Sequence, residues 1–414
     1  MKLAKKWVLD YFGKIQAGQI FLQEGDEHYT FGNEGELHAN IRVINPQFYS
    51  KSLSHGSLGA AQSFIDGDWL TNDLTTLLRI IIQNENLMQK IDSPLSKLQR
   101  LLLDIIAKIK KNTPSRAREH IHAHYDLGNQ FFQTFLDETL LYSCAIFTSP
   151  DESLYDAQMR KMERICELLA PKPTDHILEI GTGWGSLAIY LVQKYDCHVT
   201  TTTISTEQFN YVNERIHALN LQDKITLLNQ DYRDLKGHFD KIVSIEMIEA
   251  VGHQYFDTFF GKCDELLKPG GLLMIQAITM NEQTYDNAKE HIDFIKKYVF
   301  PGSCLPSIFR MGKSIAEQTD LQWLSLNDIG RNYATTLHQW HERFMNNLDS
   351  VRAQNFSEEF IRLWQYYLCY CEAGFIEDYI SDVQLLWRKR GDVKMRYNVT
   401  ANAADKTVSA AVSI

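Results

Sequence analysis

The sequence predicts an α/β protein in which a doubly wound parallel sheet follows a small α+β domain. Three observations support this prediction. First, an apolar run that ends in alternate glycines precedes a helical segment near residue 181. Second, predicted strands and helices alternate from there to residue 279. Third, the sequence before residue 54 is rich in turn residues and alternates between apolar and polar positions. The 414 residues are 44% hydrophobic and 23% charged, which is enough for two or three globular domains.

The first helix candidate places Leu3, Trp7 and Tyr11 at i, i+4 and i+8 among several lysines. A basic amphipathic helix of this kind can lie on an anionic membrane. It can also dock on its own domain and keep its lysines in solvent. The sequence leaves both interpretations open.

Alternating apolar and polar residues with interspersed glycines predict a small sheet between residues 19 and 54. The segment from 56 to 84 changes to helical spacing, and Asp73 is a suitable N-cap within it. Together these elements predict a separate N-terminal α+β domain over residues 1–92.

Residues 93–118 carry seven Lys or Arg side chains against a single Asp. Their leucines and isoleucines have helical spacing, so the segment is predicted to be a basic linker helix. Its basic face is either solvated or in contact with anionic lipid headgroups. The catalytic domain is then expected over 119–396, and the small, polar tail at 397–414 is expected to be disordered.

The motif HILEIGTGWGSLAIYL, at residues 176–191, reads as strand, tight turn and helix. Gly181, Gly183 and Gly185 permit backbone angles closed to other residues, and they let a ligand approach the main chain. The helix that opens at this turn points free N–H groups toward such a ligand. A small-molecule site is therefore expected here, against the simpler interpretation that the glycines only terminate a strand.

The residues around the glycines indicate which class of ligand the loop binds. A dinucleotide fingerprint requires a glycine where this chain has Ser186, and an acid about twenty residues on, where residues 197–205 contain none. Glu179 instead suits the pattern E-x-G-x-G-x-G, the nucleotide loop of S-adenosylmethionine (SAM) methyltransferases. The motif favours SAM.

After the loop, the sequence continues as an α/β alternation. Ligands of such sheets bind at the carboxyl ends of the strands, so Glu249, Gln276 and Ile278, placed at the ends of two neighbouring strands, are expected to converge on one crevice. A helical insert at 283–311 interrupts the alternation and is expected to cover that crevice. The expected strands are 197–204, 225–230, 241–248, 271–279, 321–329 and 383–390.

Composition excludes several classes of protein. Seven cysteines at irregular spacing, without a C-x-x-C pair, argue for reduced thiols and against a disulfide framework or a metal site. A net charge of −10 does not favour nucleic acid as a partner. No apolar run reaches about eighteen residues and the start lacks a signal peptide's apolar block, so a cytoplasmic location is expected.

Six blocks in order, YDLGNQFF, LLYSCAIF, LEIGTGWGSLA, TTTISTEQ, EMIEAVG and PGSCLP, resemble the cyclopropane-fatty-acid synthase and mycolic-acid methyltransferase family from about His120 to Arg388. The resemblance implies a class I SAM-dependent methyltransferase with a Rossmann-like sheet and a helical lid insert. The N-terminal domain resembles the extra domain of the bacterial phospholipid enzymes. This implies a lipid-associated domain and a protein held peripherally at the inner face of the cell membrane, with a homodimer as an open alternative.

The resemblance also implies a reaction. A methylene group passes from SAM to the cis double bond of an unsaturated acyl chain in a membrane phospholipid, and a bound bicarbonate ion accepts the proton whose loss closes the cyclopropane ring. Cys144, Glu249, Ile278 and Tyr333 match residues that hold this ion, and Gln276 stands where many members have histidine. Methylation without ring closure is an alternative, as is a lipid-binding protein with an inactive methyltransferase fold.

The resemblance also implies which residues bind SAM. They lie in the extended YSC segment, residues 142–144, and at the ends of the first strands of the sheet. Cys371 matches a cysteine once proposed as a nucleophile in the family, although a thiol packed in the core is the favoured interpretation. The residues assigned to SAM are Tyr142, Ser143, Glu179, Gly181, Gly183, Thr203, Ile204, Gln208 and Tyr232.

Overall fold

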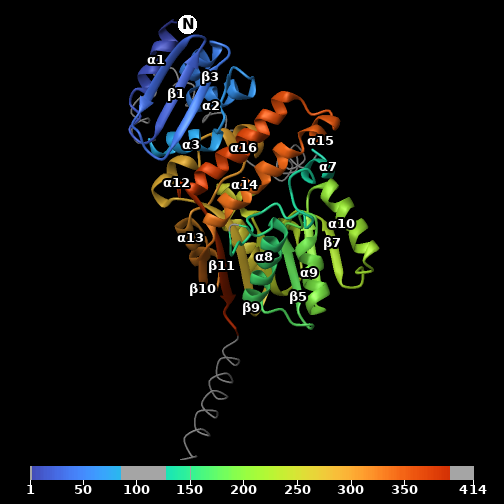
Figure 1. Cartoon of the computed structure of the whole chain (residues 1–414). Helices are drawn as coiled ribbons and strands as arrows, with labels where there is room; N and C mark the ends of the chain where they lie inside the picture. Colours follow the sequence, from blue (N-terminus) through green and yellow to red (C-terminus); the bar gives the residue numbers. More distant parts are fainter. Residues whose placement is uncertain (1, 85–126, 150, 392–414) are drawn as a thin grey trace, which may run out of the picture.

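The computed structural model describes residues 2–84, 127–149 and 151–391. Figure 1 shows an N-terminal unit lying on two long helices, α14 (Gly330–Asn346) and α16 (Glu358–Ile376), with a large sheet on the other side of them. The predicted linker helix and the predicted disordered tail lie outside the described residues.

The N-terminal unit is a four-stranded sheet packed with three helices. The strand order is β2-β1-β3-β4, in which β1 pairs antiparallel with β2 and parallel with β3. Its elements are α1 (Lys2–Phe12), β1 (Gln19–Glu24), β2 (Glu27–Gly32), β3 (His38–Val43), α2 (Gln47–Ile65), β4 (Trp69–Leu70) and α3 (Leu74–Gln83). The expected N-cap is confirmed, because the Asp73 carboxylate accepts a hydrogen bond of 2.9 Å from the Thr76 N–H.

Two expectations for this unit are wrong in detail. The sheet does not continue to residue 54, because α2 begins directly after Pro46, and proline is well suited to a helix start. In α1 the buried side chains are Ala4, Val8 and Phe12, so Leu3 is not part of the packed face and is 78% exposed. The helix is docked on its own unit, with its buried face displaced by one residue from the predicted one.

The second sheet has seven strands in the order β10-β11-β9-β8-β5-β6-β7. Strands β7, β6, β5, β8 and β9 are mutually parallel, and β11 is antiparallel to both of its neighbours. The strands are β5 (His176–Ile180), β6 (His198–Thr203), β7 (Ile225–Asn229), β8 (Phe239–Ile245), β9 (Leu267–Met280), β10 (Leu321–Asp328) and β11 (Ile380–Lys389). Each of the six strands expected after the glycine loop is confirmed, with ends shifted by up to four residues.

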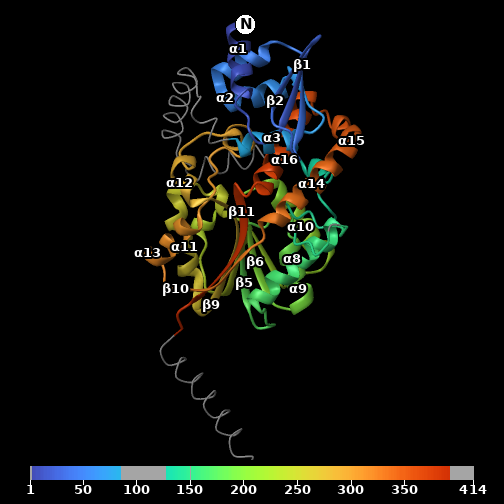
Figure 2. The same ribbon diagram turned by 60° about the vertical axis from the view of Figure 1, so that its left-hand side comes forward.

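Helices cover both faces of this sheet, as the alternation predicted. Figure 2 shows α11 and α13 on one side and α8 and α9 on the other, and two separate hydrophobic cores lie beneath them. The flanking helices are α8 (Leu154–Leu169), α9 (Ser186–Tyr195), α10 (Thr206–Ala218), α11 (Phe256–Leu266) and α13 (Ile308–Gln318). The doubly wound architecture is therefore confirmed.

A third hydrophobic core joins the N-terminal unit to α14, α16 and the segment that follows residue 127. The insert between β9 and α13 lies beside this core, and its Tyr298 hydroxyl donates to Gln62 Oε1 on α2 over 2.7 Å. The remaining helices are α7 (Asn129–Phe132), the 3-10 turns η2 (Tyr232–Asp234), η3 (Ile248–Ala250) and η4 (His253–Tyr255), α12 (Glu282–Ala288), the π-turn η5 (Ile295–Val299) and α15 (Leu348–Ala353).

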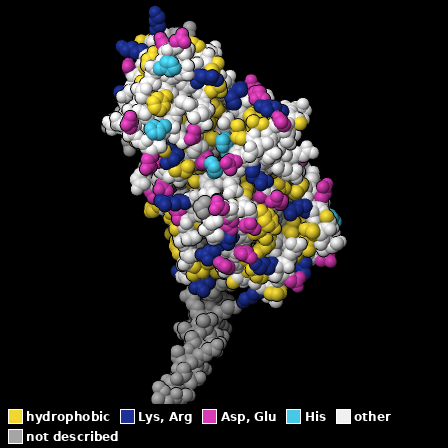
Figure 3. Space-filling model, in the orientation of Figure 1, with side chains coloured by type: hydrophobic (Ala, Val, Ile, Leu, Met, Phe, Trp, Pro, Cys, Tyr) yellow, Lys and Arg dark blue, Asp and Glu magenta, His cyan; other side chains and the backbone are white. Residues whose placement is uncertain are grey.

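The surface, the helices and the cysteines give three further observations. On the face drawn in Figure 3, Lys and Arg side chains are interspersed with Asp and Glu over both units. Along the described ranges, no helix combines the length and the apolar character needed to cross a bilayer. All seven cysteines are free thiols.

Candidate active site

The glycine loop between β5 and α9 has the conformation that the motif predicted. Gly181, Gly183 and Gly185 have φ values of 102°, 54° and 82°, which side-chain-bearing residues rarely adopt. A Cβ at Gly185 would lie 2.8 Å from Val212, whereas one at Gly183 would meet no atom within 4 Å. Gly183 therefore leaves open space in the cavity wall, where a ligand can approach the backbone.

Glu179 lies in the cavity wall below this loop. Its carboxylate accepts a hydrogen bond of 2.5 Å from Thr201 Oγ1, and the same hydroxyl lies 2.7 Å from Thr182 Oγ1 in the loop. Burial raises the pKa of Glu179 to about 8. The side chain is therefore protonated at neutral pH in the ligand-free protein.

The ends of β6 and β7 supply the second wall. Thr203 Oγ1 donates to Gln208 Oε1 over 2.8 Å, so the amide oxygen of Gln208 faces Thr203. Ile204 and Tyr232 line the cavity beside them, and Tyr232 is held in the turn η2. Asp231, which the sequence interpretation did not single out, lies in the same wall and forms a salt bridge with Arg233.

The YSC segment supplies a third wall. The hydroxyls of Tyr142 and Tyr367 lie 2.8 Å apart, and Ser143 Oγ accepts a hydrogen bond from Lys161 Nζ on α8. Lys161 is buried, and burial lowers its pKa. The sequence interpretation missed this lysine, because in α8 its position resembles any other in an amphipathic helix.

These walls enclose one cavity of about 1060 Å³ in the described part of the chain. It runs from the glycine loop, past a group of buried carboxyls, to apolar side chains of the N-terminal unit such as Trp7, Tyr11 and Leu77. Ligand pockets for single small molecules hold roughly 300–1,000 Å³. The cavity is large enough for two substrates placed end to end.

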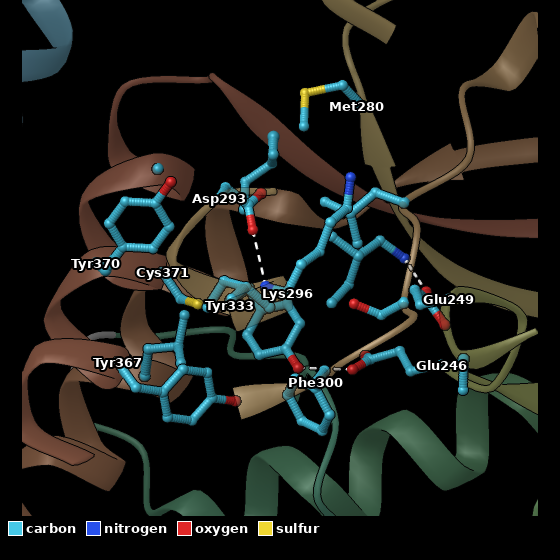
Figure 4. A pocket seen from close by; sticks show the side chains of 18 of the residues that line it. Glu246, Glu249, Met280, Asp293, Lys296, Phe300, Tyr333, Tyr367, Tyr370 and Cys371 are labelled. Carbon is cyan, nitrogen blue, oxygen red and sulfur yellow. Dashed lines mark hydrogen bonds between the residues drawn. The ribbon is translucent and has the colours of Figure 1, made fainter. Parts of the chain in front are cut away.

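Carboxyls meet where the glycine-loop end of the cavity joins the apolar end. Figure 4 shows Glu246 and Glu249 entering from one side and Tyr333 from the other. Glu249 does not end a strand as expected, because β8 stops at Ile245 and Glu249 lies in the following turn η3. Glu249 Oε1 accepts a hydrogen bond of 2.6 Å from the Ile278 N–H, while its buried Oε2 has no hydrogen-bond partner among the described residues.

Glu246 is the residue on which the other expected members of the site converge. Its Oε1 accepts from the Cys144 N–H and from Gln276 Nε2, each over 2.8 Å, and its Oε2 accepts from the Tyr333 hydroxyl over 2.6 Å. Gln276 Nε2 also lies 2.9 Å from Asp382 Oδ2 on β11. Sequence reasoning missed Glu246 and Asp382, although Glu246 lies three residues before the predicted Glu249 in the same block.

Cys371, on α16, also lines the cavity, and Figure 4 draws it among the side chains of the pocket. Burial raises the pKa of its thiol, chiefly by removing water from the charged form. A thiolate nucleophile is therefore disfavoured at neutral pH. Within the described ranges, no group of three or more His, Cys, Asp or Glu side chains has the arrangement of a metal site.

Comparison with known proteins identifies the family. The family model for mycolic acid cyclopropane synthetase matches residues 112–385. Cyclopropane-fatty-acyl-phospholipid synthase of Escherichia coli (strain K12) is 37% identical over 363 residues, which cover 84% of this chain and 90% of the relative. Tuberculostearic acid methyltransferase UfaA1 of Mycobacterium tuberculosis is 35% identical over 341 residues, which cover 80% of this chain and 78% of the relative.

Solved structures agree with the sequence comparison. The crystal structure of mycolic acid cyclopropane synthase CmaA1, complexed with SAH and CTAB, superposes with a TM-score of 0.62 at 29% identity and covers 66% of this chain and 98% of that one. The expected fold, a class I SAM-dependent methyltransferase, is confirmed. The chain belongs to the mycolic acid cyclopropane synthetase family.

Proposed function

We propose that this enzyme transfers a methylene group from SAM to the cis double bond of unsaturated acyl chains in membrane phospholipids and closes a cyclopropane ring. The observation that supports this most directly is the cavity, which joins a nucleotide-type glycine loop to an apolar channel and places carboxyls at the junction. The relative in Escherichia coli bears the name of an enzyme with this activity on phospholipids.

The residues of the glycine-loop end fit SAM as a substrate. We assign the backbone of Gly181 and Gly183 to the approach of the ligand, and Thr203, Gln208 and Tyr232 to its ribose and adenine. The remaining residues assigned to SAM are Tyr142, Ser143, Glu179 and Ile204, and all of them line the same cavity. SAM supplies an electrophilic methyl group.

The apolar end fits an unsaturated acyl chain. A cis alkene is a weak, neutral nucleophile, so it must be held close to the methyl group and away from water. Methyl transfer leaves a positive charge on the acyl chain. Aromatic rings at the junction, including Tyr333 stacked on Phe375 at 4.5 Å between ring centroids, offer π faces that stabilise such a cation.

The lipid enters from the membrane surface in this proposal. The N-terminal unit forms the far wall of the channel, and α1 there presents Leu3 to solvent beside its lysines. Basic residues near an anionic surface contribute about 1 kcal/mol each to binding. We therefore assign the protein to the inner face of the membrane as a peripheral enzyme, and a homodimer remains a prediction for sedimentation to test.

Bicarbonate, which the family resemblance implies as the base, does not fit the described residues. The N–H of Cys144, the amide of Gln276 and the hydroxyl of Tyr333 already donate to Glu246, and the N–H of Ile278 donates to Glu249. The donors that would hold the ion are thus already bonded to carboxyl groups of Glu246 and Glu249.

The proposed activity is tested with purified enzyme, SAM and vesicles of phospholipid that contain a cis-unsaturated acyl chain. Cyclopropane protons in the high-field region of the proton NMR spectrum of the extracted lipid are the expected result. SAM consumption without that signal would overturn ring closure. SAM binding without turnover would instead favour the alternative of a lipid-binding protein with an inactive methyltransferase fold.

Methylation without ring closure is the second candidate. Its support is the 35% identity to a relative named as a tuberculostearic acid methyltransferase. In that case a hydride shifts from the methylated carbon to the neighbouring cationic carbon, and loss of a proton from the methyl group then leaves a methylene branch on the chain. A saturated methyl branch would need a separate reductant to reduce that methylene. The same spectrum decides between the two, because a methylene product shows vinylidene protons and lacks cyclopropane protons.

A further inference from the structure

Glu246 has a backbone conformation that is costly for its residue type. It directly follows the last residue of β8 and has a φ of 47°, in the left-handed region that favours glycine. Such a conformation is unfavourable for a residue with a side chain and persists where the surroundings enforce it, often at functional sites. Here the backbone turn aims the carboxylate into the wall of the cavity.

The carboxylate is held by three donors from different parts of the chain. The N–H of Cys144 comes from the YSC segment, the amide of Gln276 from β9 and the hydroxyl of Tyr333 from α14. These are three of the five residues that the family resemblance assigns to bicarbonate. A carboxylate and bicarbonate share a planar O–C–O group with the same acceptor geometry, so Glu246 occupies the position expected for the ion.

An added ion could enter only if Glu246 moved away from these donors. The Glu246 carboxylate would then be a buried charge without hydrogen-bond donors, which is strongly unfavourable. The other two assigned residues, Glu249 and Ile278, are bonded to each other and provide no replacement site. The geometry therefore excludes bicarbonate while Glu246 is in place.

We propose that the carboxylate of Glu246 is the base of the reaction and replaces bicarbonate in this enzyme. This inference rests on the proposed function. The methyl group leaves the sulfonium with its bonding electrons kept by sulfur, and the alkene electrons form the new C–C bond. Glu246 then takes a proton from that methyl, and the C–H electron pair closes the ring and neutralises the cation. The proton leaves Glu246 to solvent before the next turnover.

The neighbouring acids have different roles. Burial and the nearby Glu246 charge raise the pKa of Glu249 to about 8, so Glu249 holds its own proton at neutral pH. Burial also raises the pKa of Glu246, while Lys161 and the three donors act in the opposite direction. A carboxylate whose pKa is raised is a stronger base and is suited to accept a proton. Burial also raises the pKa of Asp382, which accepts a hydrogen bond from Gln276 Nε2.

The experiment measures turnover of unsaturated phospholipid vesicles in buffer stripped of carbon dioxide and bicarbonate, and again after bicarbonate is added. Wild-type turnover should stay within about twofold between the two buffers, because the base is part of the chain. Glu246→Gln keeps the shape but cannot accept a proton, and its kcat should fall at least about 100-fold with unchanged SAM affinity.

Glu246→Gly is the decisive variant, because glycine accepts the local φ without strain and frees the three donors. It should be inactive in bicarbonate-free buffer and should regain activity when bicarbonate or formate is added. Glu249→Ala serves as the matched control, because it removes an acid from the same cavity without freeing the three donors to Glu246. Added bicarbonate should not raise the turnover of this variant. Glu163→Gln, on the exposed face of α8, should behave as wild type.

Two results would overturn the proposal: wild-type turnover that collapses without bicarbonate and returns with it, or Glu246→Gln turnover close to that of wild type. Wild-type enzyme that makes no alkylated lipid in either buffer would contradict the proposed function instead. The two failures are therefore distinguishable in one set of assays.

Discussion

Thr75 on α3 and Glu372 on α16 are joined by a hydrogen bond of 2.8 Å between Thr75 Oγ1 and Glu372 Oε2, although 297 residues separate them. One turn further along both helices, Arg79 Nε donates to Glu377 Oε1 over 2.6 Å. These contacts fasten the N-terminal unit to a helix that lines the cavity. The position of the lipid channel therefore depends on them.

Loss of the Arg79–Glu377 pair should loosen this attachment. Both side chains are largely buried, so each single alanine variant should lower stability, and a double-mutant cycle should give a coupling of about 1 kcal/mol. KM for phospholipid vesicles should rise while the Kd for SAM stays constant, because the glycine loop is untouched. A coupling of zero together with an unchanged KM would show that the pair does not hold the channel.

Gly183→Val should abolish tight SAM binding. The substitution forces a β-branched residue into a φ of 54° and fills the open space in the cavity wall, so SAM affinity by calorimetry should fall at least about tenfold. Gly270→Val is the matched control, because Gly270 has a φ of 80° and equally open surroundings but lies outside the cavity. Equal SAM affinity in both variants would argue against the loop as the cofactor site.

Tyr333→Phe should slow the chemical step. It removes the hydroxyl that donates to Glu246 and leaves the ring in place, and hydrogen bonds to charged groups contribute about 1.5–3 kcal/mol. A fall in kcat of about 10- to 100-fold is expected, with little change in SAM affinity. Tyr29→Phe removes a comparable hydroxyl bond to Glu27 on the surface and should leave kcat unaltered.

Glu179 should make stability depend on pH in the absence of SAM. Its pKa is about 8 in the folded protein and near 4.5 in the unfolded chain, so the folded state binds more protons between these values. Stability contributed by this group is present below about pH 4.5 and declines as pH rises toward 8, by at most about 1.4 kcal/mol per pH unit. Denaturant unfolding of wild type and Glu179→Gln at pH 6 and pH 8 measures the difference. Identical pH dependence of the two proteins would contradict it.

The sequence predicted what depends on local pattern. The glycine loop, the alternating strands and the Asp73 cap are specified within a few residues, and each was found where it was expected. The end of the first sheet was misplaced because the residues after Pro46 also alternate, and only packing of Phe48 and Tyr49 in α2 distinguishes helix from strand.

The arrangement at Glu246 could not be predicted in this way. Its donors lie 102, 30 and 87 residues away in the sequence, so their convergence is a product of the tertiary fold. The sequence interpretation carried a family role onto Glu249 and assigned the remaining negative charge to an external ion. The sequence did show a second glutamate in the block SIEMIEAVG. It did not show the positive φ of Glu246, which directs the carboxylate toward its donors.

The hydrophobic core that the N-terminal unit shares with α14 and α16 has a consequence for how the chain can be dissected. Aromatic rings of the N-terminal unit and of the helices pack together in this core. The ring centroids of Phe64 on α2 and Tyr366 on α16, for example, lie 5.7 Å apart. Groups that share one core melt together, so calorimetry should show no separate early transition for the N-terminal unit. A truncated protein that lacks this unit would expose an apolar helix face to water and should aggregate, which makes the full chain the smallest practical unit for study.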